Sequence, residues 1–189
     1  MAPLEFLFVA IGIISIILLY CSIHFFIKAR NCKTIVEFPV DSNTHNLEFK
    51  TSGLFSLCFI GTKNISSDGS FKAMIYSSDF ASITLKPTFP NWTFKEKGVY
   101  GVEYFKFNIK KTGCYTLDLK NHEGLKTSQF VLPLNALLDH QTDNSYLKVR
   151  IKQAVPSWQR LFSVLALVLG INGLTWGIMI GVFNIFSAE

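Results

Sequence analysis

Charged residues are scarce at both ends of this chain. No Asp, Glu, Lys or Arg occurs in residues 6–27 or in residues 161–187, and charged residues make up only 16% of the 189 residues. An α-helix rises about 1.5 Å per residue, so about 20 apolar residues cross the roughly 30 Å hydrocarbon layer of a bilayer. The sequence therefore predicts two transmembrane helices, at residues 6–27 and 158–187, in an integral membrane protein.

The first apolar run also lacks the features of a cleaved signal peptide. No basic residue precedes it and no small-x-small cleavage site follows it, and it exceeds the usual apolar length of about 7–15 residues. We therefore expect both runs to remain in a two-pass protein, with residues 28–155 forming one extramembrane domain.

Sequence motifs of catalytic and nucleotide-binding sites are missing. The chain has no GxSxG nucleophile elbow, no HExxH zinc motif, no P-loop and no GxGxxG fingerprint. We therefore predict that the protein is not an enzyme and has no catalytic residues, metal or cofactor. The residues nearest to a metal-binding pattern match no known ligand spacing; they are His122, Glu123, Asp139, His140 and Asp143.

Cysteine is rare as well. The predicted domain holds three cysteines, Cys32, Cys58 and Cys114, without a CxxC spacing. An odd number without metal-ligand spacing argues against a zinc site or a dense disulfide framework. Alternation of apolar residues places Cys58 and Cys114 on outward strand faces, so we expect them to be poor core residues. Pairing between these two stays open.

Basic residues are absent outside the segment from Lys28 to Arg160. That segment carries all 18 Lys and Arg residues and 11 of the 13 acidic ones, a net charge of +7. Basic residues near helix ends favour the cytoplasmic side, which predicts a cytoplasmic domain on a protein of a bacterial inner membrane. The rule weakens for loops longer than about 60 residues, so the opposite orientation stays open. The lysines are scattered over many predicted strands, so we expect no nucleic-acid partner.

Between the predicted helices, short runs of alternating apolar and polar residues are separated by Gly, Pro, Asn, Asp and Ser. This period of two is typical of strands, and about nine short strands predict an all-β sandwich or jelly-roll-like domain. We expect loops at residues 61–70, 86–95 and 133–145. The predicted strands span residues 34–38, 46–50, 54–60, 71–76, 82–86, 102–110, 114–119, 128–132 and 146–152.

The domain contains an internal repeat. Residues 47–59 align without gaps on residues 107–119, sixty positions later. Each segment reads as a strand, a turn that ends in Gly53 or Gly113, and a returning strand with one apolar face. Glycine suits such turns because it readily adopts positive φ. We expect two comparable β-hairpins, through either an ancestral duplication or common hairpin geometry.

The predicted loop at residues 86–95 concentrates aromatic residues between prolines. Phe89, Trp92 and Phe94 are rigid and large, so they can bury much area at small entropic cost. We expect them to bind a protein partner. Aromatic rings that fold back onto the open end of the sandwich are the alternative.

Small residues form one stripe along the second predicted helix. In lipid, close backbone approach across small residues replaces the hydrophobic effect as the cause of helix association. We expect the stripe to pack against the first helix, whose residues 12, 15, 19 and 22 also share one side, or against another copy in a homo-oligomer. This glycine-zipper pattern comprises Ser163, Ala166, Gly170, Gly173, Gly177 and Gly181.

Basic residues alternate in the segment before the second helix. Lys148, Arg150 and Lys152 share one strand face, and Trp158 and Arg160 follow at the predicted membrane boundary. Anionic head groups attract such cations by about 1 kcal/mol each, and amphipathic rings settle at the interface. We expect contact with the membrane surface, with an ordinary solvated strand as the alternative.

Together these features predict a non-enzymatic, membrane-anchored β-sandwich that binds a protein partner at the bilayer. The protein would serve as an accessory subunit, or as an immunity protein against a membrane-acting toxin, a role that needs membrane residence and no catalysis. One alternative is a small-ligand-binding or enzymatic domain on the sandwich scaffold, which requires a concave pocket with converging polar groups. Another is a module that contacts the lipid surface.

Overall fold

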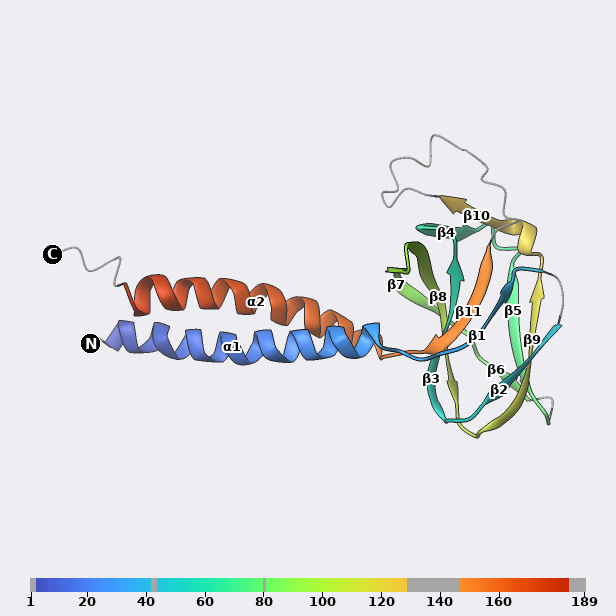
Figure 1. Cartoon of the computed structure of the whole chain (residues 1–189), viewed down its shortest axis with the longest axis horizontal. Coiled ribbons are helices and arrows are strands. Elements are labelled where there is room, and N and C mark those ends of the chain that lie inside the picture. The colour runs from blue at the N-terminus through green and yellow to red at the C-terminus, as the bar shows by residue number, and fades with distance from the viewer. Residues whose placement is uncertain (1–2, 42–43, 80, 129–146, 184–189) are drawn as a thin grey trace. The chain divides into compact units, whose positions relative to one another are not determined.

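The computed structural model covers the whole chain and describes residues 3–41, 44–79, 81–128 and 147–183. The chain forms two compact units, one that contains both chain ends and one that spans residues 32–154. The first unit consists of two long apolar helices that pack together, and the second contains antiparallel sheets (Figure 1). The sheets therefore lie between the two helices in the sequence.

The first unit is the helix pair α1 (Pro3–Arg30) and α2 (Ser157–Gly181). Within the described residues, both helices are long and apolar enough to cross a membrane. Helix α2 begins directly after Pro156. A proline is tolerated there because the first N–H groups of a helix have no partner inside the helix.

The described residues of the second unit, the β domain, form two larger sheets and one small sheet. The strands are β1 (Thr34–Pro39), β2 (Thr44–Phe49), β3 (Gly53–Ile60), β4 (Asn64–Ser67), β5 (Lys72–Ser77), β6 (Ser82–Ile83), β7 (Lys86–Glu96), β8 (Val99–Ile109), β9 (Gly113–Lys120), β10 (Leu125–Ser128) and β11 (Lys148–Gln153). The five-stranded sheet has the order β1-β11-β3-β8-β7 and the four-stranded sheet the order β2-β9-β5-β6. The small sheet pairs β4 with β10, and a short 3-10 helix, η1 (His122–Gly124), precedes β10.

One hydrophobic core receives side chains from both larger sheets. Its aromatic centre includes Phe49, Phe55 and Phe107, and the ring centroids of Phe49 and Phe55 are 4.7 Å apart. Because side chains alternate along a strand, Leu117 and Leu119 of β9 also point into this core and are fully buried. Burying one such side chain contributes about 1.5–3 kcal/mol, so this core is the main source of stability in the β domain.

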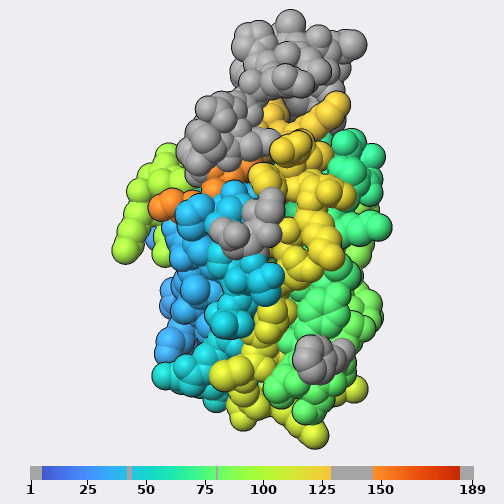
Figure 2. Space-filling model, turned by 90° about the vertical axis from the view of Figure 1, so that its right-hand side faces the viewer, coloured from blue at the N-terminus to red at the C-terminus, as the bar shows by residue number. Residues whose placement is uncertain are grey.

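The outer face of the four-stranded sheet carries the alternate residues of the same strands. Figure 2 shows β2, β9 and β5 side by side across this face. Asn46 and Glu48 of β2 are exposed on it, whereas Leu47 between them is buried in the core. The predicted alternation therefore holds along this strand.

The two repeated segments are not hairpins, which corrects the prediction. Strands β2 and β3 of residues 47–59 belong to different sheets, and so do strands β8 and β9 of residues 107–119. A hairpin would keep both strands in one sheet. Each repeated segment instead forms an arch, in which two consecutive strands belong to different sheets and direct their apolar faces toward each other across the core. Apolar and polar residues alternate in the same way in a hairpin and in an arch, so the alternation does not distinguish the two. The turn glycines Gly53 and Gly113 have φ of 137° and 144°, which confirms the predicted positive φ.

The first arch (residues 47–59) and the second arch (residues 107–119) pair with each other reciprocally. Leu47 of the first arch lies opposite Tyr115 of the second. Sixty positions along, Phe107 of the second arch lies opposite Phe55 of the first. Each arch therefore pairs with the other through equivalent positions. The sequence repeat thus corresponds to an approximate two-fold arrangement of hydrogen-bonded strands.

Two predicted loops contain strands. Residues 61–70 include β4, which pairs with β10, and Thr62 Oγ1 donates hydrogen bonds to the carbonyl oxygens of Asn64 and Ser128. Residues 86–95 form most of β7. This strand lies at the edge of its sheet, where prolines are tolerated. The predictions that concern residues 129–146 and 184–187 lie outside the described residues.

Candidate functional site

Strand β7 carries the three aromatic residues that the sequence assigns to partner binding. Its pairing with β8 is interrupted after Pro87 and resumes at Trp92, so residues 88–91 form a bulge. Phe89 on this bulge is 91% exposed, whereas Trp92 and Phe94 are half-buried. Figure 2 shows the β7 region, in lime, projecting beside the sheet. The three rings therefore do not form one surface, and Phe89 alone among them points outward.

The half-buried Phe94 covers an ionic cluster that no sequence pattern predicted. Glu103 is 0% exposed. Its Oε1 lies 3.1 Å from Lys152 Nζ and its Oε2 lies 3.8 Å from Lys106 Nζ. The Lys152 ammonium lies 3.7 Å from the centroid of the Phe94 ring, an attractive cation–π arrangement. The cluster lies on the face of the five-stranded sheet that points away from the core.

Cys58 is fully buried on this same face, contrary to the expectation that it is a poor core residue. It lies on β3 opposite Glu103, and Ser56 on the same strand lies opposite Lys152. These small side chains leave room for the long ionic side chains of neighbouring strands to meet above them. Cys114 is exposed, and no disulfide joins it to Cys58. The alternation of side chains predicted the face of the sheet on which Cys58 lies correctly. The ionic side chains above Cys58 bury its thiol.

The predicted basic face of β11 is paired with carboxylates of the same domain. Arg150 Nε donates a hydrogen bond of 2.8 Å to Glu37 Oε2, and its guanidinium also pairs with Glu96. Lys148 Nζ lies 3.6 Å from Glu37 Oε1. Partial burial lowers the pKa of Arg150, but hydrogen bonds and the charges of Glu37 and Glu96 outweigh it, so the pKa is raised. Together with Lys152 in the buried cluster, this face offers little uncompensated charge to a lipid surface.

Trp158 and Arg160 lie in the first turns of α2, in the other unit. Trp158 is exposed and Arg160 is half-buried. Their contact with a membrane surface, like that of β11, stays a prediction.

The small-residue stripe of α2 lies against α1. A Cβ atom added to Gly177 would come within 2.7 Å of the Gly12 Cα, whereas one added to Gly12 would lie 3.6 Å from the Gly177 Cα. Ser22 is fully buried and its Oγ donates a 2.8 Å hydrogen bond to the Ser163 carbonyl. The stripe therefore has a partner within its own chain, which was one of the two partners considered. The other stripe residues that pack here are Ala166, Gly170, Gly173 and Gly181.

Among the residues that the structure describes, no three His, Cys, Asp or Glu side chains come together as metal ligands. His122 and Glu123 lie on η1. The other residues weighed as ligands, Asp139, His140 and Asp143, lie outside the described residues.

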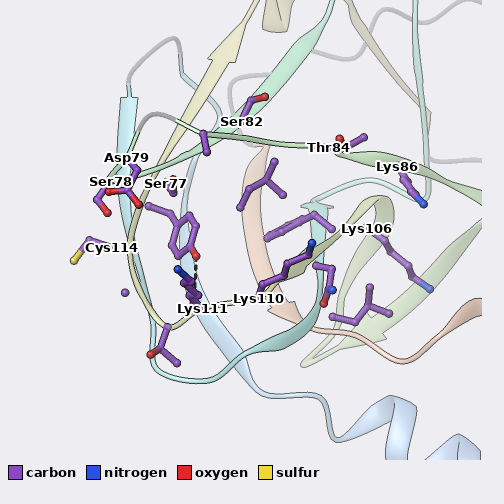
Figure 3. Close-up of a pocket in the computed structure, with 18 residues that line it drawn as sticks. Ser77, Ser78, Asp79, Ser82, Thr84, Lys86, Lys106, Lys110, Lys111 and Cys114 are labelled. Carbon is purple, nitrogen blue, oxygen red and sulfur yellow. Dashed lines mark hydrogen bonds between the residues drawn. The ribbon is translucent and has the colours of Figure 1, made fainter.

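A cavity of about 690 Å³ lies beside the second arch, between the β5–β6 turn and the ends of β8 and β9 (Figure 3). Strand β6, at the edge of the four-stranded sheet, has only two residues, Ser82 and Ile83, and both line the cavity. Tyr115 Oη donates a 2.7 Å hydrogen bond to the Lys111 carbonyl and holds the turn in place. We call this the arch cavity.

Four lysines and one aspartate among the described residues line the arch cavity. Lys86 and Lys106 lie opposite each other on β7 and β8, and like charges in such pairs repel. Figure 3 shows Asp79, with Ser77 and Ser78, on the other side of the cavity from this pair. Lys110 and Lys111 come from the turn of the second arch. The sequence alone did not indicate this site, because its lysines are spread over three segments.

No protein-family model matches this chain, and no curated protein matches its sequence.

Proposed function

We propose that this chain is a non-enzymatic, membrane-anchored β-sandwich of jelly-roll type that binds a protein partner at the bilayer. Its two helices cross the membrane as a packed pair. The helix surface supports this part of the proposal, because Ile13, Ile17 and Leu165 are more than half exposed. Exposing apolar surface to water costs about 25 cal/mol per Å², whereas in lipid the same surface carries no such cost.

One observation supports the partner-binding part. Among the described residues of the β domain, the large apolar side chains left exposed are Phe89 and Val99, and Phe89 is 91% exposed on its bulge. Aromatic anchors that fill a partner's pocket supply most of the binding energy in many protein interfaces. Trp92 and Phe94, which follow the bulge, are half-buried where β7 pairs with β8 again. We propose that Phe89 is the anchor and that the partner supplies an apolar pocket.

Membrane residence is tested with the full-length protein in its host membrane fraction. We expect it to resist extraction by alkaline carbonate and to dissolve in neutral detergent. A reporter inserted near Asp68 would establish the side of the membrane, where we expect a cytoplasmic readout. Recovery of the protein in the aqueous carbonate fraction would contradict membrane crossing.

Partner binding is tested by chemical crosslinking and purification in mild detergent, with Phe89→Ala beside Val99→Ala as the matched control. We expect one protein to be lost from the Phe89→Ala sample and retained with Val99→Ala, and the purified pair to reassociate. An accessory subunit would be recovered in a stoichiometric complex. An immunity protein would protect sensitive cells against a toxin, and protection would fall with Phe89→Ala. Equal recovery of all partners by both variants would contradict the role of Phe89.

A further inference from the structure

We propose that the arch cavity binds an organic phosphate, with the phosphate on the lysines and an apolar portion against the cavity wall. This inference does not rest on partner binding through Phe89.

The first support is an excess of positive charge, because four lysines and one carboxylate, that of Asp79, line the cavity among the described residues. Of the four lysines, Lys106 is paired with Glu103 at 3.8 Å. Within the described residues, no carboxylate oxygen lies within 4.0 Å of the ammonium groups of Lys86, Lys110 or Lys111. Lys110 and Lys111 are adjacent in the turn of the second arch. A phosphate that accepts hydrogen bonds from their ammonium groups would form charge-assisted hydrogen bonds, which are the strong ones.

The second support is the character of the walls. Ser77, Ser82 and Thr84, which carry hydroxyl groups, line the cavity together with the apolar residues Leu54 and Ile83. Hydroxyl groups can donate further hydrogen bonds to phosphate oxygens, and the apolar parts suit a short hydrocarbon. The volume of about 690 Å³ lies in the range of about 300–1,000 Å³ that small-molecule sites occupy.

The third support is the difference between the two arches. In the first arch, the end of β11 covers the turn: Ala154 N donates to the Leu54 carbonyl at 2.9 Å, and Gln153 Nε2 lies 3.4 Å from Thr51 Oγ1. In the second arch, the equivalent turn holds Lys110 and Lys111 and opens into the cavity. Two turns of similar sequence therefore differ, because the end of β11 covers the first and the second is free to contact a ligand in the cavity.

A phosphate group with an apolar portion could come from a membrane lipid or from a soluble organophosphate. The two sources share the chemistry and are separated by the choice of probe. Inorganic phosphate, hexyl phosphate and dihexanoyl phosphatidic acid serve as soluble probes, and nanodiscs of phosphatidylcholine with or without phosphatidic acid provide the lipid source.

The experiment uses the full chain in a neutral detergent and measures binding by calorimetry. We expect hexyl phosphate to bind more tightly than inorganic phosphate, because its alkyl chain reaches the apolar wall. Lys110→Gln with Lys111→Gln should weaken hexyl phosphate binding at least about tenfold, since two charge-assisted hydrogen bonds are lost. The matched control is Lys50→Gln with Lys72→Gln, which removes the same charge elsewhere and should leave the affinity within about twofold. Lys50 is the first-arch equivalent of Lys110.

Two further measurements separate the cavity from general surface charge. Ala81→Phe fills the cavity without a change in charge and should weaken hexyl phosphate more than inorganic phosphate. In the unmodified protein, hexyl phosphate should shift the amide resonances of residues 110–112 at lower concentrations than those of residues 50–52. This measurement does not depend on the folding of a variant. Saturable binding by phosphatidic acid nanodiscs assigns the lipid source, and binding by the soluble probes alone assigns a soluble organophosphate.

Several outcomes would overturn the proposal. They are the absence of saturable binding by every probe, equal weakening by the Lys110/Lys111 and Lys50/Lys72 variant pairs, and resonance shifts spread evenly over the surface lysines. Loss of partner binding in Phe89→Ala with phosphate binding retained would leave this proposal intact.

Discussion

The helix pair and the β domain distribute their side chains in opposite ways. Where α1 meets α2, glycine, serine and alanine of α2 lie against α1, whereas large apolar side chains such as Ile17 and Leu165 are exposed. In the β domain, Phe55 and Leu117 are buried and polar residues such as Glu48 are exposed. The helix pair thus exposes apolar side chains, whereas the β domain buries them. In water, burial of apolar area stabilises a core, whereas in lipid close backbone packing holds helices together.

The largest test of this comparison is the same substitution at a buried and an exposed phenylalanine of the β domain. Phe55→Ala should lower the free energy of unfolding by about 3–5 kcal/mol, because it leaves a cavity in the core. Phe89→Ala should change it by no more than about 0.5 kcal/mol. Chemical denaturation in neutral detergent, followed by near-ultraviolet circular dichroism, measures both. Similar losses would mean that Phe89 is packed in solution.

The buried ionic cluster is the exception to the pattern in the β domain, and its removal should have the next largest effect. Glu103→Ala leaves two lysines without their shared carboxylate and should cost about 3 kcal/mol. We expect the lower end of the usual range because the Lys106 and Lys152 side chains retain slight exposure, 9% and 10%.

A matched variant separates charge from packing in this cluster. Glu103→Leu combined with Lys106→Met and Lys152→Met removes all three charges at similar volume and should restore most of the lost stability. A triple variant as unstable as Glu103→Ala would show that packing, and not unpaired charge, is responsible.

In the helix pair, the two glycines at the closest approach should respond differently. Gly177→Ala places a methyl group 2.7 Å from the Gly12 Cα, a backbone atom that cannot rotate away, and should cost about 1–3 kcal/mol of helix packing. Gly12→Ala has an ordinary contact of 3.6 Å and should be nearly neutral. Thermal loss of helical circular dichroism in detergent measures both. If even Gly177→Ile alters neither stability nor association, the packing role of the stripe is wrong.

The smallest expected effect concerns a charged surface loop of the β domain, which has no counterpart in the apolar helix spans. Hydrogen bonds from the side chain and from the backbone N–H of Ser70 lower the pKa of Asp68 below its ordinary value of 3.8. A lowered pKa in the folded state contributes stability above the unfolded value that is lost as the pH falls through the folded value. Asp68→Asn should therefore lower the melting temperature slightly at neutral pH, and the difference between variant and parent should disappear as the pH falls well below 3.8.

Much of the fold follows from local pattern. The absence of charge defines α1 and α2, and alternation places Leu47 inside and Glu48 outside. Gly53 and Gly113 mark turns because few other residues adopt their φ. The pairing partners of these strands could not be predicted, because a hairpin and an arch require the same alternation and the same turn glycine.

The candidate sites followed from sequence only in part. Phe89, Trp92 and Phe94 form one aromatic motif in the sequence, but the bulge in β7 exposes one ring and folds two back. The Glu103 cluster and the arch cavity combine residues from three or more strands, and no window of sequence contains them.

The sequence by itself determined which segments are apolar along their length, which alternate, and where the chain can turn, because these properties depend on neighbours within a few residues. Only the tertiary structure decided that the repeated segments join two sheets, that Cys58 and Lys152 are buried on an outward face, and that one arch is sealed while the other is open. Those outcomes depend on hydrogen bonds and contacts between segments far apart in the chain, whose pairing is selected by the total burial and hydrogen bonding of the whole domain.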